Sequence, residues 1–196
     1  MTPKSGRYHH GDLRAALVDV AIELIAERGV QGFSLAEASR RLGVTVAAPY
    51  KHFADRDELL AAVAVKASEH LAAAVTVEAA ATNGPDRLAA AAAGYVRCAA
   101  AHRPLFQVLF EAGLDKSRYP EIDAAAQPIA EAFLIPARTI RADPADAHEL
   151  TLAVVAAAHG HAALLLDGAF GRGPEALDAA TRRTTTVTRA IVAGWR

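Results

Sequence analysis

Apolar residues along this chain recur at steps of three and four positions and do not alternate with polar ones. Over residues 11–28, Leu13, Leu17, Leu24 and Ile25 place one apolar stripe along a helix. The same spacing predicts further helices at about 34–42, 45–53, 55–80, 86–102, 105–112, 121–141, 145–167 and 175–194. The fold class is therefore expected to be all-α, with about nine helices.

Capping residues mark the ends of the short helices near the N-terminus. Ser34 and Glu37 form the S-x-x-E pattern of a capping box, and Gly43 supplies a turn where the second helix ends. Asp55 and Glu58 form a similar helix start. These signals predict three closely spaced helices before residue 60.

Prolines interrupt two of the expected helices. Pro49 is the fourth residue of a helix capped by Thr45, and it has no N–H for the first helical hydrogen bond. We expect an irregular or tightened first turn there. Pro128 and Pro136 predict a kinked or broken helix over 121–141.

Residues 34–53 contain the parts of a helix-turn-helix: a short capped helix, a glycine turn and a second short helix. This arrangement lets the second helix enter the major groove of DNA while the first crosses the backbone. Val46, Ala47 and Ala48 are small, so the tip of the second helix can approach base edges closely. Their methyl groups can contact thymine methyls.

The charge pattern indicates that any DNA binding must depend on a local group of basic and polar residues, and not on the net charge of the chain. The chain is 53% hydrophobic and carries a net charge of −1, so it has no overall basic field. Tyr50, Lys51, His52 and Arg56 follow the tip and offer hydrogen-bond donors to phosphate. Taken alone, Tyr50 and His52 would be a core tyrosine and a capping histidine. Further cations and rings lie at Lys4, Arg7, Tyr8, His9, His10, Arg40 and Arg41.

The helix lengths divide the chain into two expected units. The first three helices are short, and the later ones are longer and rich in Ala and Leu. We expect a DNA-binding domain at 1–56 and a helical ligand-binding and dimerisation domain at 57–196.

The expected location is the cytoplasm. No apolar segment follows Met1, and the single cysteine, Cys98, fits a reducing compartment. Cys98 is either a small buried residue or a redox-sensing thiol. The apolar run 150–166 contains two histidines and is shorter than the about 20 residues of a membrane span, so no membrane association is expected.

The segment FSLAEASRRLGVTVAAPYKHFADRDELL resembles the DNA-binding signature of TetR-family transcriptional regulators. The matching positions are Ser34, Ala38, Gly43, Val44, Tyr50, His52, Phe53, Arg56, Leu59 and Leu60. Pro49 stands where the family usually has Leu, Ile or Val, and it is similar to a subgroup with AAPY. That subgroup often carries a C-terminal domain with a Trp-His-Gly signature, of which His159-Gly160 is present here.

The resemblance implies a function and a set of contacts. Family members are homodimers that bind operator DNA, here expected to be palindromic, and are released by a small molecule. The resemblance implies that Val46, Ala47 and Lys51 face bases and that Thr45, Ala48, Tyr50, His52 and Arg56 lie by phosphates. Ser34 begins the helix that crosses the backbone and belongs to the same expected DNA-binding set.

The C-terminal half is expected to hold an apolar effector. Candidate lining residues are Tyr95, Phe106, Phe110, Phe133, His159 and Leu166, although each is also compatible with ordinary core packing. His159 is either a hydrogen-bonded buried residue or a polar group of the pocket. The last helix has an apolar seam, so a helix-bundle dimer is expected; a monomer that covers both faces itself is the alternative.

Other functional classes have less support in the sequence. His102, His148, His159 and His161 lack the i, i+3 or i, i+4 spacing of paired helical metal ligands, so no metal and no cofactor are expected. We find no nucleophile–base pair and no paired carboxylates, so an enzyme is not expected. The alternative hypothesis is a helical ligand or metal sensor that acts through protein contacts.

Overall fold

The computed structural model describes residues 13–84 and 86–195, which contain eight α-helices and no strand. The expected arm with Lys4, Arg7, Tyr8, His9 and His10 lies outside these residues, as does Pro85. The helices are α1 (Leu13–Arg28), α2 (Leu35–Leu42), α3 (Arg56–Ala80), α4 (Asp86–Ala101), α5 (Arg103–Glu111), α6 (Pro120–Ile140), α7 (Pro144–Leu166) and α8 (Pro174–Gly194). Three 3₁₀ turns are η1 (Val30–Gly32), η2 (Pro49–Lys51) and η3 (Lys116–Arg118). The all-α prediction is confirmed.

The capping residues act as the sequence predicts. Ser34 Oγ accepts a hydrogen bond from Glu37 N–H at 3.3 Å, and Asp55 Oδ1 accepts one from Glu58 N–H at 2.8 Å. Gly43 has φ 68°, the left-handed conformation that favours glycine, and ends α2. Local signals therefore fix three helix ends.

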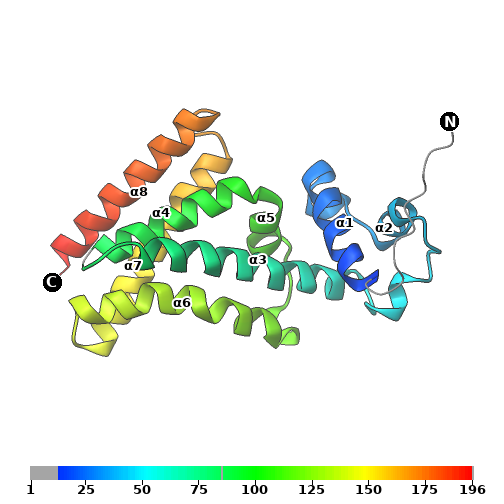
Figure 1. Cartoon of the computed structure of the whole chain (residues 1–196), viewed down its shortest axis with the longest axis horizontal. Coiled ribbons are helices and arrows are strands. Elements are labelled where there is room, and N and C mark those ends of the chain that lie inside the picture. Colours follow the sequence, from blue (N-terminus) through cyan, green and yellow to red (C-terminus); the bar gives the residue numbers. More distant parts are fainter. Residues whose placement is uncertain (1–12, 85, 196) are drawn as a thin grey trace.

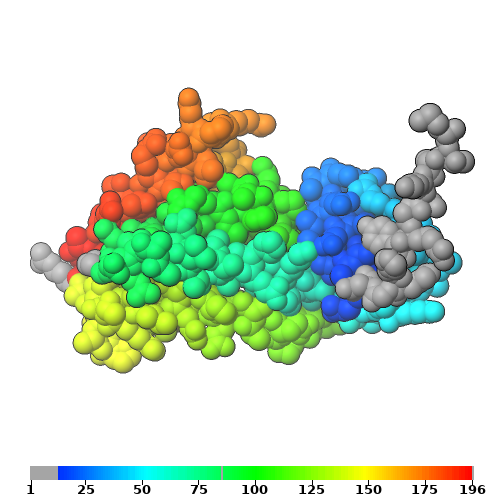
Figure 2. All heavy atoms as spheres, viewed as in Figure 1, coloured from blue at the N-terminus to red at the C-terminus, as the bar shows by residue number. Residues whose placement is uncertain are grey.

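The long helix α3 joins the two ends of the molecule. Figure 1 shows it running from the small unit of α1 and α2 into the bundle of α4 to α8. Its buried residues include Leu59 and Leu60 at one end and Leu71 and Val75 farther along, and all belong to one continuous apolar core. The space-filling view shows an elongated molecule with the α1–α2 unit at one end (Figure 2). A displacement of α3 would therefore reach both units.

Of the kink or break expected over residues 121–141, the break does not occur, because α6 is one continuous helix that contains Pro128 and Pro136; the kink stays a prediction. Pro128 lies on an exposed face, where water can satisfy the carbonyl that its missing N–H leaves free. Pro136 is buried and packs in the core. The apolar face of α6 therefore holds the helix together across both prolines.

Two helices, α3 and α7, are long and apolar enough to cross a membrane by length and composition alone. In the folded chain, α3 is a core helix. By contrast, α7 buries one face in the bundle and leaves Leu152 and Leu164 about half exposed, at 49% and 48%. The core helix of a folded domain satisfies the same criteria.

Candidate nucleic-acid interface and ligand pocket

The segment after α2 is a series of tight turns, so the predicted helix over 45–53 is wrong. Because Pro49 has no N–H, it cannot bond to the Thr45 carbonyl, which instead accepts from Ala48 N–H at 3.0 Å. The Pro49 carbonyl then accepts from the N–H groups of His52 and Phe53, at 2.9 and 3.0 Å. The tightened turn expected at Pro49 thus extends through the whole segment, leaving only the 3₁₀ turn η2.

Two buried side chains anchor this turn segment to the core. Pro49 is buried, and Phe53 is only 1% exposed. The Arg14 guanidinium lies over the Phe53 ring, 4.9 Å from its centre. With Pro49 and Phe53 inward, the side chains of Thr45, Val46, Ala47, Tyr50, Lys51 and His52 are exposed to solvent.

The outer surface of the turn segment carries most of the predicted DNA-binding residues. Val46 and Tyr50 are 55% and 56% exposed. The exposed members of the set are Thr45, Val46, Ala47, Tyr50, Lys51 and His52, and Ala48 is half-buried. Ser34 is exposed but its hydroxyl caps α2.

Arg56 does not project into this surface. Its Nε donates to the Phe33 carbonyl at 3.3 Å, and its Nη2 donates to the Val30 carbonyl. The guanidinium also lies over the Phe33 ring, at 5.8 Å from the ring centre, and its Nη1 is 3.7 Å from Asp57. Arg56 therefore holds η1 and the following residues against the start of α3.

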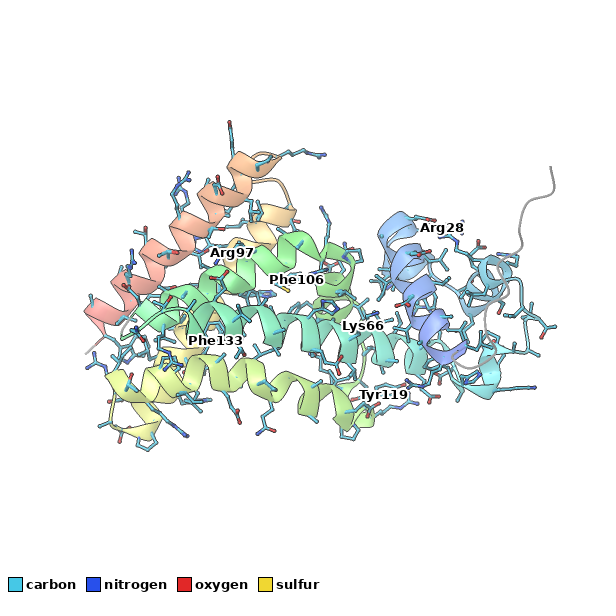
Figure 3. The ribbon with its side chains drawn as sticks, in the orientation of Figure 1. Arg28, Lys66, Arg97, Phe106, Tyr119 and Phe133 are labelled. Atoms are coloured by element: carbon cyan, nitrogen blue, oxygen red, sulfur yellow. The ribbon has the colours of Figure 1, made fainter. Side chains whose placement is uncertain are left out.

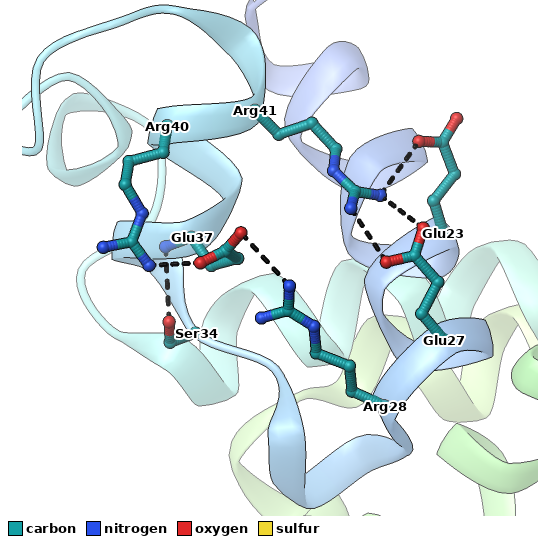
Figure 4. Close-up of polar contacts among 7 residues, drawn as sticks. All are labelled: Glu23, Glu27, Arg28, Ser34, Glu37, Arg40 and Arg41. Atoms are coloured by element: carbon teal, nitrogen blue, oxygen red, sulfur yellow. Dashed lines mark hydrogen bonds and ion pairs between the residues drawn. The ribbon is translucent and has the colours of Figure 1, made fainter.

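The arginines of α2 are compensated by carboxylates of α1 and α2, a pairing that the sequence did not predict. Arg41 makes two hydrogen bonds of 2.8 Å to Glu27 and lies 3.7 Å from Glu23 (Figure 4). Glu37 binds Arg40 and lies 3.5 Å from Arg28. The hydrogen bonds of the arginines lower the pKa of Glu27 and of Glu37, so both carboxylates are charged at neutral pH.

Carboxylates neutralise Arg40 and Arg41 of α2, and Lys51 on the outer surface of the turn segment differs from them. No ion pair to Lys51 occurs among the described residues. It stands beside the exposed Tyr50 and His52. The interface is therefore a small group of polar side chains next to two small apolar ones.

A pocket of about 650 Å³ opens between α3, α4, α5, α6 and α7. Its size lies within the range typical of small-molecule sites. Among the predicted residues, Tyr95, Phe110, Phe133 and His159 line it. Phe133 of α6 and Phe106 of α5, both buried, are labelled in Figure 3.

An aromatic cluster forms the inner wall of the pocket. Tyr95 Oη and His159 Nδ1 are 3.0 Å apart and share a hydrogen bond. The Phe106 ring stacks on His159 at 5.4 Å between centres, and the Phe110 ring meets His159 at 4.6 Å. Burial raises the pKa of Tyr95 far above its usual value, so its hydroxyl stays neutral.

Two predicted pocket residues lie elsewhere. Phe106 supports the cluster from behind, and it lines a small adjoining space beside His70 and Cys98 instead. Leu166 lies by a different cavity, near the loop between α7 and α8. Its role in ligand binding stays a prediction, because periodicity places a residue on a face but cannot say which cavity that face meets.

Other lining residues were not anticipated. They are mainly apolar side chains of α6 and α7, including Ile122, Ile129, Leu152 and Val155. Ser68 of α3 also lines the pocket and is only 1% exposed. A serine on the apolar face of the helix 55–80 was the signal in the sequence that could have identified it.

Two family models match the chain. The model of bacterial regulatory proteins of the tetR family matches residues 17–63, and the tetracyclin repressor-like C-terminal domain matches residues 88–192. The second match alone covers more than half of the chain. No curated protein sequence matches.

Solved structures share the fold over nearly the whole chain. A protein of unknown function from Rhodococcus sp. RHA1 is 29% identical with a TM-score of 0.80, covering 97% of this chain and 98% of that one. The TetR family regulator PfmR from Thermus thermophilus is 20% identical with a TM-score of 0.67, covering 88% and 97%. The multidrug binding protein EbrR, solved with imidazole, is 22% identical with a TM-score of 0.59, covering 89% and 93%. Together with the two matched domains, the fold assigns this chain to the TetR family of bacterial transcriptional regulators, with an N-terminal DNA-binding domain.

Proposed function

We propose that this protein is a repressor that binds a palindromic operator as a homodimer and is released by a small, largely apolar molecule. The observation that carries the proposal is the turn segment 45–52, whose small and polar side chains face solvent while Pro49 and Phe53 hold it from inside. An exposed segment of this composition suits close approach to DNA.

The proposed DNA contacts are assigned according to the solvent exposure of the side chains in the turn segment. Val46, Ala47 and Lys51 face bases, and Thr45, Tyr50 and His52 donate to phosphates. Ala48 has no side-chain donor and takes part only through its backbone. Arg56 and Ser34 are positioning residues, because their polar groups already bind within the chain.

The proposed dimer pairs the outer faces of α7 and α8. The outward face of α7 carries Leu164 and Leu152, which also lines the pocket, with small residues between them, and it has no charged side chain from 150 to 166. On α8, Val187 is 37% exposed. A monomer rarely leaves a continuous apolar face of this length in water. In such a dimer the two turn segments must meet successive major grooves, about 34 Å apart.

The effector site is proposed to be the pocket of Tyr95, Phe110, Phe133 and His159. Its buried wall is aromatic and aliphatic, which favours an apolar guest. The finer assignment of this half to the Trp-His-Gly type rests on His159-Gly160. No catalytic role is proposed for the pocket, and the proposed location is the cytoplasm.

The proposed coupling runs through two walls of the pocket. The helix α5 contacts η1 and α1 of the DNA-binding domain, and η1 is also held by Arg56 at the start of α3. At the other wall, α6 packs along α3, and Glu121 in the first turn of α6 lines a surface hollow together with Arg14 and Val18 of α1. A guest that spreads these helices would therefore tilt the turn segment and change the separation of its two copies.

A mobility-shift experiment with the DNA beside the protein's own gene tests the proposal. We expect a shift at low salt with wild-type protein, and loss of the shift after Tyr50→Ala with Lys51→Ala. The matched control is Lys116→Ala, which removes an exposed lysine at the pocket rim and should leave the shift intact. A folded dimer that fails to shift this DNA at low salt would refute the proposal.

A further inference from the structure

Ser68 places an unpartnered hydroxyl in the wall of the pocket. Its side chain is 1% exposed, and no hydrogen bond to Oγ occurs among the described residues. A buried serine in a helix usually bonds the carbonyl four residues earlier. Ser39 does so with Leu35 at 2.9 Å, and Thr151 with Ala147 at 2.9 Å. A buried hydroxyl without a partner is unfavourable, so its position calls for a partner that enters the pocket.

The other buried polar groups of the pocket already have partners. The Tyr95 hydroxyl is paired with His159, and the Thr151 hydroxyl with its own helix. Lys116 and Asp123 are exposed and carry opposite charges. Among the described residues that line the pocket, Ser68 is therefore the fully buried side chain whose hydroxyl has no partner, in a mostly aromatic and aliphatic wall.

We propose that Ser68 Oγ is the group that recognises the effector, and that the effector is a neutral, ring-containing apolar molecule with one hydroxyl or carbonyl. The inference rests on the proposed role of this pocket as the effector site. Flat rings fit against Phe110, Phe133 and His159, and the single polar group pairs with the serine. A charged effector would lack a buried counter-charge in this wall.

The location of Ser68 connects its proposed hydrogen bond with the effector to the DNA-binding domain. It lies on α3, the helix that begins at Arg56 beside η1. A guest held by Ser68 on α3 and by the rings of α5 and α6 contacts three helices that reach the DNA-binding domain. The polar group therefore contributes to the release signal as well as to affinity.

The test compares two fluorescent probes that differ by one hydroxyl, pyrene and 1-hydroxypyrene. Both are titrated into the full-length wild-type protein, Ser68→Ala and the control Ser39→Ala. Ser39 is a buried serine far from the pocket with a satisfied hydroxyl. We expect the affinity ratio of 1-hydroxypyrene to pyrene to fall about 3- to 10-fold in Ser68→Ala and to stay unchanged in Ser39→Ala. An unchanged ratio in Ser68→Ala, or failure of both probes to bind wild-type protein, would overturn the inference.

Thermal unfolding without probe gives an independent readout. Removing an unpartnered buried hydroxyl should leave the melting temperature of Ser68→Ala equal to or above the wild-type value, whereas Ser39→Ala should melt lower. A lower melting temperature for Ser68→Ala would show a structural partner for its hydroxyl and contradict the inference. The mobility shift separates the two proposals: no shift with wild-type protein refutes the proposed function, whereas a normal shift with an unchanged probe ratio refutes only the role of Ser68.

Discussion

Replacing Arg56 by alanine should weaken the fold and leave the salt dependence of DNA binding unchanged. The guanidinium donates to the carbonyls of Phe33 and Val30 and lies over the Phe33 ring. A side chain that bound phosphate instead would contribute to counterion release, and its removal would reduce the salt slope. The two roles therefore predict opposite patterns in two measurements.

The expected loss of stability follows from the hydrogen bonds of Arg56. A hydrogen bond to a charged group contributes about 1.5–3 kcal/mol. The Arg56 side chain is 32% exposed, so water replaces part of what the two carbonyls lose. We therefore expect the free energy of unfolding to fall by about 2 kcal/mol, which lowers the melting temperature by about 4–8 °C in a chain of this length.

The assay pairs Arg56→Ala with Lys51→Ala. Lys51 is exposed and has no ion pair in the described part of the chain, so its variant should melt like the wild type. Because Lys51 is proposed to face bases, Lys51→Ala should weaken binding to the operator more than binding to unrelated DNA, whereas Arg56→Ala should leave the slope of log affinity against log salt at its wild-type value. The reasoning about Arg56 fails if Arg56→Ala melts normally and makes this slope shallower by about 0.9, the value for one lost phosphate contact.

Two further substitutions test the packing and the titration of the C-terminal bundle. Gly94→Ala should lower the free energy of unfolding by about 1–3 kcal/mol in urea denaturation, because its Cβ would lie 2.9 Å from Glu78 Cγ and 3.0 Å from the Ala74 carbonyl; a variant as stable as wild type would show that α3 and α4 can separate freely. Partial desolvation and the neighbouring His102, whose ring centre is 4.9 Å away, lower the pKa of His70 below its usual 6.5, although part of the ring stays exposed. Since the unfolded chain then binds the proton more readily, stability should fall as pH drops through about 6.5, and His70→Gln should reduce this loss in melts at pH 7.5 and 5.5; an equal loss in the variant would contradict the assignment.

Local chemistry explains what the sequence predicted well. Ser34, Asp55 and Gly43 act on backbone groups within five residues, so their effects are visible in a short stretch of letters. Side-chain spacing also identified the all-α class and four of the pocket residues. The capping residues bind groups of their own helix, and the four pocket residues lie on the inner helix faces that the spacing predicts.

Tertiary packing explains what the sequence predicted poorly. The sequence did not reveal that Arg56 binds the carbonyls of Phe33 and Val30, because these partners lie 23 and 26 positions away. Arg41 meets Glu27 only because α1 and α2 pack together. The continuity of α6 through two prolines likewise depends on its packed face and not on its propensity.

Pro49 affects both the local backbone conformation and the tertiary packing of the turn segment. The missing N–H rules out a regular helix from Thr45, and the buried ring fixes where the turns must sit relative to Phe53. A turn segment held by two buried side chains has little freedom of its own, so it must move with the core that holds it. That core continues along α3 to Ser68 and the pocket. The proposed regulation therefore needs no flexible recognition element, since a tilt of α3 set by the guest would carry the rigid segment with it.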